Sequence, residues 1–173
     1  MTTHKTKEIK KDIGATRAFL EKIVINAGVG RASQISGFEE KIMPQIIRDI
    51  GILAGQRPQV RRSRKSIAGF KMREGQIVGI RVTLRGQRMV DFFERLIRIV
   101  LPRVRDFNGI PLSGVDDGGA LNIGLREQYV FSEISPEESP FSFAFQINVV
   151  PRRKDRASAL ATYRNWGVPL KKK

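Results

Sequence analysis

The stretch QIVGIRVTLRGQRMVDFFERLIRIVLPRV, residues 76–104, decides the fold class because its apolar spacing changes from period two to a helical period. The first part predicts a strand with one buried face and one polar, basic face. The buried face would carry Val78, Ile80, Val82 and Leu84, and the other Gly79, Arg81, Thr83 and Arg85. The second part predicts a helix that ends near Pro102. Its core stripe would be Met89, Phe92, Phe93, Leu96, Ile97, Val100 and Leu101.

The residues before this stretch predict a strand, a helix and a second strand. The expected spans are 21–26, 36–55 and 58–63. Ser36 and Glu39 fit a capping box for the helix, and Gly55 closes it. Pro44 predicts a kink or a second start inside it, because proline cannot donate a backbone hydrogen bond.

The residues after this stretch begin with a long irregular segment, 105–120, which is longer than compact domains normally leave without a function or a partner. Strands are expected over 121–131 and 141–150. A last helix would start at Asp155, acting as its cap, and run to about Trp166.

The resulting order of elements contains the βαββαβ core of a split βαβ sandwich. We therefore expect an α/β (α+β) fold, ferredoxin-like or RRM-like, in which helices lie on one face of an antiparallel sheet. No repeat or linker divides the sequence, which predicts a single domain over residues 1–173. Residues 1–18 and 168–173 are expected to be mobile basic tails until a partner binds.

The composition removes several classes of function. The chain has no cysteine, and its one histidine, His4, lies in a polar N-terminal segment, which argues against disulfides, thiolate metal sites and serine- or cysteine-based catalysis. No apolar run approaches the roughly 20 residues that a membrane span needs. The sequence thus predicts a cytoplasmic protein with no cofactor, no metal, no membrane partner and no enzymatic activity.

The net charge of +15 in 173 residues points to a polyanionic partner. Residues 61–73 carry six cations and no acid, and residues 151–173 carry eight cations against Asp155, so these segments hold 13 of the 15 net charges. Solvated basic faces that only prevent aggregation are the alternative. A cytoplasmic polyanion is usually nucleic acid, and no basic recognition helix or finger motif favours B-DNA. Folded RNA, read mainly by shape, phosphate and ribose, fits better.

Three motifs suggest other chemistry but are explained more simply by turns and solvated loops. GVGRAS, residues 28–33, lacks the pattern of a phosphate loop, so its glycines are expected to supply positive φ or close backbone approach. Asp116 and Asp117 suggest Mg²⁺ or an acid–base pair, yet Asp and Gly are ordinary turn residues. The acidic loop of Glu133, Glu137 and Glu138 is expected to be solvated, with a contact to a basic protein as its alternative.

Four stretches together resemble the large-subunit ribosomal protein five family, over about residues 20–150. They are KIVINAGVG, GQRPQVRRSRKSIAGFKMREG, VTLRGQRMVDFFERLIRIVLPRVRDFNGI and NIGLREQYVFSEI. The resemblance implies a structural role in the large ribosomal subunit, at the central protuberance. It also implies the partners 5S rRNA, large-subunit rRNA with neighbouring ribosomal proteins, P-site tRNA, and a small-subunit protein across the subunit interface.

The resemblance also implies which residues bind. Polar contacts to 5S rRNA would come from Asn26, Gln56 and Thr83, with Arg57, Arg61 and Arg85 on phosphates. The tRNA-contacting loop would be Lys65, Ser66, Ile67, Ala68, Gly69, Phe70 and Lys71. Ile67 and Phe70 would pack against a base or a sugar of the tRNA, or Phe70 would anchor the loop to its own domain.

One group of cations and two other functions complete the expectations. Compared with the family pattern, the chain has extra cations at Arg61, Arg62 and 152–154, which are hypothesised to add rRNA contacts. A free regulatory or chaperone-like RNA-binding module is the first alternative to a ribosomal protein. An enzyme acting on RNA or phosphate esters through Asp116 and Asp117 is the second.

Overall fold

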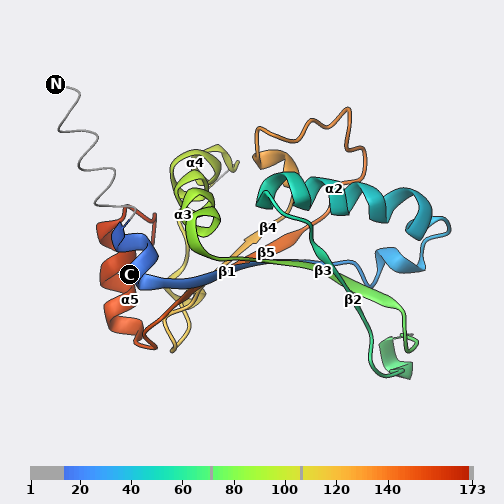
Figure 1. The fold of residues 1–173 in the computed structure, drawn as a ribbon, viewed down its shortest axis with the longest axis horizontal. Helices are drawn as coiled ribbons and strands as arrows, with labels where there is room; N and C mark the ends of the chain where they lie inside the picture. Colours follow the sequence, from blue (N-terminus) through green and yellow to red (C-terminus); the bar gives the residue numbers. More distant parts are fainter. Residues whose placement is uncertain (1–13, 71, 106, 172–173) are drawn as a thin grey trace. The chain divides into compact units, whose positions relative to one another are not determined.

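The computed structural model describes residues 14–70, 72–105 and 107–171. Within these residues, five strands form one sheet in the order β2-β3-β1-β5-β4, and β2 and β3 pair antiparallel (Figure 1). The strands are β1 (Leu20–Gly28), β2 (Gln59–Arg62), β3 (Ile77–Leu84), β4 (Leu121–Leu125) and β5 (Phe145–Pro151). Besides the helical residues 14–19, the α-helices are α2 (Met43–Ala54), α3 (Gly86–Arg95), α4 (Leu101–Arg103) and α5 (Arg156–Asn165). The predicted α+β class with an antiparallel sheet is confirmed, whereas the ferredoxin-like topology stays a prediction.

The chain divides into two compact units. Among the described residues, the first unit comprises those in the ranges 14–24, 83–123 and 148–171, and the second those in the ranges 25–82 and 124–147. Each has its own buried apolar residues. In the first unit they include Leu96, Leu101, Leu121, Val149 and Tyr163, and in the second Ile25, Phe38, Ile50, Ile80 and Phe131. The expectation of one domain stays a prediction.

The first predicted helix is two helical segments. A π-helical turn, Phe38–Ile42, precedes α2, and Pro44 lies in the first turn of α2. Proline fits there because the first N–H groups of a helix have no partner within it. Pro44 therefore marks a second start. The capping box is wrong: the N-cap of the π-helical turn is Gly37, with φ 76° and no side-chain cap. Gly55 ends α2 with φ 64°, as predicted.

Strand β3 is buried in the predicted alternation only in its second half. Ile80, Val82 and Leu84 are buried, but Val78 is half-buried between buried Ile77 and Gly79. The cause is a β-bulge, since Arg61 of β2 pairs with Gly79 and the next residue, Arg62, with Ile77. The carbonyl of Val78 instead accepts from Val29 N at 3.1 Å.

The helix predicted after β3 is present and continues through a π-helical turn. Helix α3 passes into Leu96–Val100, which has π-helical spacing, and then into α4. Pro102, which has no backbone N–H to donate, falls in the first turn of α4, directly after this π-helical turn. All seven predicted core residues of this stretch are buried.

Strands β4 and β5 are shorter than predicted. Strand β4 ends at Leu125, and a 3₁₀ turn follows at Gln128–Val130. The fully buried Gln128 side chain donates to Phe141 O at 2.8 Å and accepts from Phe143 N at 3.1 Å. Because a side chain satisfies these backbone groups, the residues directly before β5 need no hydrogen bonds to a neighbouring strand.

The C-terminal helix follows the prediction. Asp155 caps α5 by accepting from Ala157 N at 3.1 Å and Ser158 N at 3.3 Å. Residues 14–19 are helical, and Lys171 N donates to Ile110 O at 2.8 Å. The rest of the expected tails, 1–13 and 172–173, lies outside the described residues, and tail mobility stays a prediction. No helix in the described ranges is long and apolar enough to cross a membrane.

Candidate nucleic-acid interface

The basic loop between β2 and β3 is the tip of a hairpin. Ile67 and Met72 exchange two backbone hydrogen bonds, of 2.9 and 3.1 Å, around a 3₁₀ turn, Ala68–Phe70 (Figure 1). Nearer the strands, Ser63 N donates to Gln76 O at 2.8 Å. The Ser66 hydroxyl accepts from Glu74 N at 3.0 Å. Backbone bonds and small hydroxyl groups therefore define the path of the tip.

Most side chains of this tip point to solvent. The exposed residues include Arg64, Lys65, Ser66, Ile67, Ala68, Gly69 and Arg73, and Ile67 is 44% exposed. Arg62 has a structural contact instead, because its guanidinium donates to Gly75 O at 2.9 Å. Among the described residues, the head groups of Arg64, Lys65 and Arg73 form no hydrogen bond or ion pair. The side chain of Phe70 and all of Lys71 lie outside what is described.

The base of the hairpin is bonded to the glycine loop that follows β1. Gln76 Nε2 donates to Ser33 Oγ at 2.8 Å, and Ser33 Oγ donates to Gly30 O at 2.9 Å. The Ser33 hydroxyl therefore already has hydrogen-bond partners, one of them at the base of the hairpin. The expected reason for Gly28 and Gly30 is wrong: neither has positive φ, and a Cβ on either would meet nothing closer than 4.0 Å.

Asn26 and Arg61 are brought to one polar face of the second unit. Arg61 of β2 is opposite Gly79 of β3, and the side chains of paired residues share a face. A Cβ on Gly79 would lie 3.8 Å from Asn26 Oδ1, so the glycine leaves room for that amide. Gln59 and Arg81, which pair two positions further along the strands, extend this face. Arg61 Nη1 also donates to Gln59 Oε1 at 3.4 Å.

Gln56 and Arg57 lie in the turn between α2 and β2, in the second unit. Arg57 is exposed and Gln56 is half-buried. This turn is anchored by Gly55 N, which donates to Gly51 O at 2.9 Å. Arg57 is accessible to a ligand, whereas part of Gln56 is covered.

Thr83 and Arg85, the remaining predicted 5S rRNA residues, belong to the first unit. Thr83 is half-buried. Arg85 Nη1 lies 3.6 Å from Glu21 Oε1, and Lys22 Nζ lies 3.1 Å from the same oxygen. Lys22, and more weakly Arg85, lower the pKa of the Glu21 carboxyl. Arg85 keeps 60% of its side chain exposed, so the pair with Glu21 leaves it open to solvent.

Asp116 and Asp117 occupy a turn. Asp116 Oδ1 accepts from Ala120 N at 2.8 Å, and Asp116 O accepts from Gly119 N at 2.9 Å. Asp117 is exposed. In the described part of the chain, no three His, Cys, Asp or Glu residues are grouped to hold a metal. The turn interpretation accounts for Asp116.

Sequence reasoning missed a polar network that holds the acidic loop in the second unit. Asp49 is 1% exposed and accepts from Ser139 Oγ at 2.8 Å, while Gln45 Nε2 donates to Phe141 O at 2.8 Å. Arg48 donates to Glu138 O and Ser139 Oγ. One signal was present: Asp49 lies within the apolar stripe of α2, where a buried carboxylate requires a partner.

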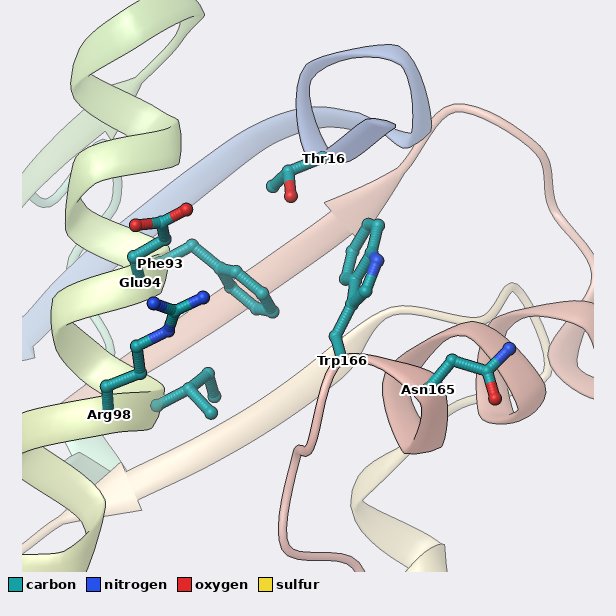
Figure 2. A pocket seen from close by; sticks show the side chains of 7 residues that line it. Thr16, Phe93, Glu94, Arg98, Asn165 and Trp166 are labelled. Carbon is teal, nitrogen blue, oxygen red and sulfur yellow. The ribbon is translucent and has the colours of Figure 1, made fainter. Parts of the chain in front are cut away.

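A cavity of about 170 Å³ in the first unit is lined by Thr16, Phe93, Glu94, Ile97, Arg98, Asn165 and Trp166 (Figure 2). The Trp166 ring meets Phe93 edge-on at 5.6 Å between centroids and Phe19 at 5.3 Å. These contacts make Trp166 part of the packing of this unit. A stacking platform for bases would need an open ring face.

Two family descriptions match most of the chain. Residues 17–73 match the family described as ribosomal protein L5, and residues 77–170 match the description of the C-terminus of that ribosomal family.

Individual relatives agree with these matches. The chain is 43% identical over 153 residues to large ribosomal subunit protein uL5 of Fusobacterium nucleatum, covering 88% of this chain and 81% of that protein. It is 45% identical over 152 residues to uL5 of Rubrobacter xylanophilus, covering 88% and 82%. Against uL5c of Tetradesmus obliquus, identity is 43% over 151 residues, covering 87% and 82%. Identity of this level across so much of both chains shows that this protein belongs to the ribosomal protein L5 (uL5) family.

Proposed function

We propose that this protein binds 5S rRNA in the central protuberance of the large ribosomal subunit, and that its β2–β3 hairpin contacts P-site tRNA. As a member of the L5 family it is a large-subunit ribosomal protein that acts in translation, with rRNA and other ribosomal proteins as partners. The family is structural and non-enzymatic, which removes the enzyme alternative at Asp116 and Asp117.

The observation that carries the proposal is the hairpin tip with three cations that have no partner among the described residues. Arg64, Lys65 and Arg73 are exposed, and the backbone between them is held by bonds that do not use their head groups. Phosphate neutralisation releases counterions and rewards cations that are free before binding. Such a tip suits an RNA backbone.

The proposed 5S rRNA surface uses the polar face that Asn26 and Arg61 share. An amide and a guanidinium on one face offer donors and an acceptor for ribose and base edges together with a contact for phosphate. Folded RNA is recognised mainly by shape and such mixed contacts. Arg57 would add a phosphate contact from its exposed turn. Gln56, Thr83 and Arg85 remain proposed members of the same binding function.

The proposed tRNA contact uses the outermost part of the hairpin tip, residues 65–71. Ile67 is 44% exposed among the cations, so it offers apolar contact for a sugar or a base. Lys65 supplies charge beside it. This combination explains why an apolar side chain would remain in water in the free protein, since its partner covers it only on the ribosome.

The proposed contact with a small-subunit protein is assigned to the acidic loop. Glu137 and Glu138 are exposed, and the backbone beneath them is tied to α2 through Arg48 and Ser139. Acidic side chains on a fixed loop are complementary to a basic protein surface, and they would be repelled by RNA.

A binding assay across a salt series tests the 5S rRNA proposal. The wild-type protein is titrated onto 5S rRNA and onto an unrelated structured RNA of equal length. Selective binding to 5S rRNA should persist at moderate salt, and Asn26→Ala should lower the affinity for 5S rRNA by roughly 10-fold, which corresponds to about 1.4 kcal/mol. The exposed Asn108 provides the matched control, since Asn108→Ala should leave the affinity unchanged. Equal wild-type binding to both RNAs at every salt concentration would contradict the proposal.

A further inference from the structure

The turn between β5 and α5 carries a second group of cations, in the first unit. Arg152, Arg153 and Lys154 are consecutive and all exposed. Within the described residues their head groups form no ion pair or hydrogen bond. Among the described residues, the cations of this turn are therefore as free of partners as those of the hairpin tip, although the turn belongs to the other unit.

The backbone of this turn is fixed at both ends. Arg152 N donates to Phe19 O at 2.8 Å, and Phe19 packs edge-on against Tyr163 and Trp166. At the other end, Asp155 O accepts from Ala159 N at 3.0 Å. The three cations thus project from a fixed frame, which reduces the entropy lost when they bind.

Close packing against Gly119 also fixes the end of this turn. Gly119 has φ 77°, and a Cβ there would lie 3.0 Å from Asp155 O and 2.8 Å from Ala159 Cβ. The backbone of residues 116–120 can approach Asp155 only because residue 119 has no side chain. This contact holds the frame without using a cationic head group.

The neighbouring charged residues do not neutralise the turn. The Asp155 carboxylate accepts from the amides of Ala157 and Ser158, so it is directed to the helix end. Arg156 is used structurally, because its guanidinium donates to Val115 O at 3.1 Å and Leu112 O at 3.0 Å. The bond to Phe19 also places the turn beside the end of the helix that carries exposed Arg17.

We infer that Arg152, Arg153 and Lys154 form a second phosphate-binding surface for rRNA, made of none of the proposed 5S rRNA or hairpin residues. The inference extends the proposed function and rests on the chain being an rRNA-binding protein. RNA is favoured over an acidic protein because the surface has only cations and no apolar centre of the kind that protein interfaces bury. The surface contributes sequence-independent affinity.

The test is the salt dependence of RNA binding by the triple variant Arg152→Gln/Arg153→Gln/Lys154→Gln. Each neutralised phosphate contributes about 0.7 to 0.9 to the slope of log affinity against log salt. The variant should lower that slope by roughly 2 to 3 and the affinity at about 100 mM salt by at least 10-fold. Two RNA probes, 5S rRNA and transcribed large-subunit rRNA, distinguish which rRNA supplies the phosphates.

A matched control removes the same charge from separate places. Arg31, Arg126 and Arg164 are exposed, and Arg31→Gln/Arg126→Gln/Arg164→Gln should lower the slope by less than about 1. An unchanged slope in the turn variant with both RNAs would overturn the inference, as would an equal loss in the control variant. If the wild-type protein bound 5S rRNA and the unrelated RNA equally well, only the proposed function would be overturned. The difference in slope between the turn variant and the wild type would still report on the turn.

Lysine acetylation of the RNA complex provides an independent reading. Lys154 should be protected several-fold when the wild-type protein binds RNA, whereas exposed Lys41, on the π-helical turn before α2, should react as in the free protein. Equal reactivity of Lys154 with and without RNA would contradict the inference even if the slope changed.

Discussion

The hairpin tip, residues 63–76, and the acidic segment, residues 135–143, are both irregular parts of the second unit. The acidic segment includes Glu137 and Glu138 of the acidic loop. The two segments are held in opposite ways. The hairpin is closed by backbone bonds and by the hydroxyls of Ser33 and Ser66. The acidic segment is held by larger polar side chains from elsewhere in the unit, above all Gln128 and Asp49, which are buried. One segment therefore keeps its charged groups free, and the other depends on polar groups that are already used.

Burial and pairing of polar groups separate a binding segment from a structural one. A polar group that is buried and fully paired contributes to stability, and losing its partner leaves a desolvated group unpaired. A charged group that is exposed and unpaired contributes little to stability and is available to a ligand. The same kinds of residue thus predict opposite mutational effects in the two segments.

The largest expected effect is on the stability of the acidic segment. Gln128→Leu leaves the buried Phe143 N–H without its acceptor and removes one donor from Phe141 O. The free energy of unfolding should fall by about 2 to 4 kcal/mol, measured by chemical denaturation. The exposed Gln146 supplies the control, because Gln146→Ala should change stability by no more than about 0.5 kcal/mol. If Gln128→Leu unfolds at the same denaturant concentration as the wild type, the network does not hold the segment.

Removal of charge from the hairpin should leave stability unchanged and lower the affinity for tRNA. Arg64→Gln/Lys65→Gln/Arg73→Gln should leave the unfolding free energy within about 0.5 kcal/mol of the wild type, because none of these head groups has a partner to lose among the described residues. Affinity for tRNA should fall by roughly 10- to 100-fold, about 1.4 to 2.8 kcal/mol, measured with a tRNA titration at fixed salt.

Arg62, the arginine of the same hairpin that bonds to a backbone carbonyl, provides a comparison for this experiment. Arg62→Gln removes the bond to Gly75 O, so it should change stability more than any one of the three free cations. Full tRNA affinity in the triple variant would show that the tip is not the contact.

The smallest expected effect is at the base of the hairpin. Ser33→Ala removes the acceptor of Gln76 Nε2 and the donor to Gly30 O. The unfolding free energy should fall by about 1 kcal/mol, since these groups are half-buried and water can replace part of the bonding. The salt slope of RNA binding should stay unchanged because no cation is lost. Ser36→Ala is the control, as that hydroxyl is exposed and does not cap the helical turn. A loss of RNA affinity at fixed salt without any change in the unfolding free energy would place Ser33 in the RNA contact and contradict its structural role.

Much of the fold could be predicted because periodicity records burial directly. The stripe from Met89 to Leu101 was predicted residue by residue and is buried in full. Asp155 was predicted as a cap and accepts two backbone amides. The failures have local causes. The bulge at Val78 shifts the pattern by one residue, and Gln128 replaces strand pairing with side-chain bonds, which no spacing rule detects.

The amino-acid sequence is sufficient to establish the fold class and the family of this protein. Apolar spacing sets which faces are buried, and the two basic segments set the sign of the charge, since both depend on residue types alone. The motifs that resemble the ribosomal family extend over most of the chain, and the matched relatives establish that family.

Which polar groups already have partners follows from the folded structure and not from the sequence. Ser33 meets Gln76 across 43 positions, and Asp49 meets Ser139 across 90. Arg62 is bonded to a carbonyl, whereas Arg64 in the same run has no partner among the described residues. This is so because a hydrogen bond depends on the distance and direction between groups that the chain brings together only on folding. The folded structure therefore decides which cations remain free to meet phosphate.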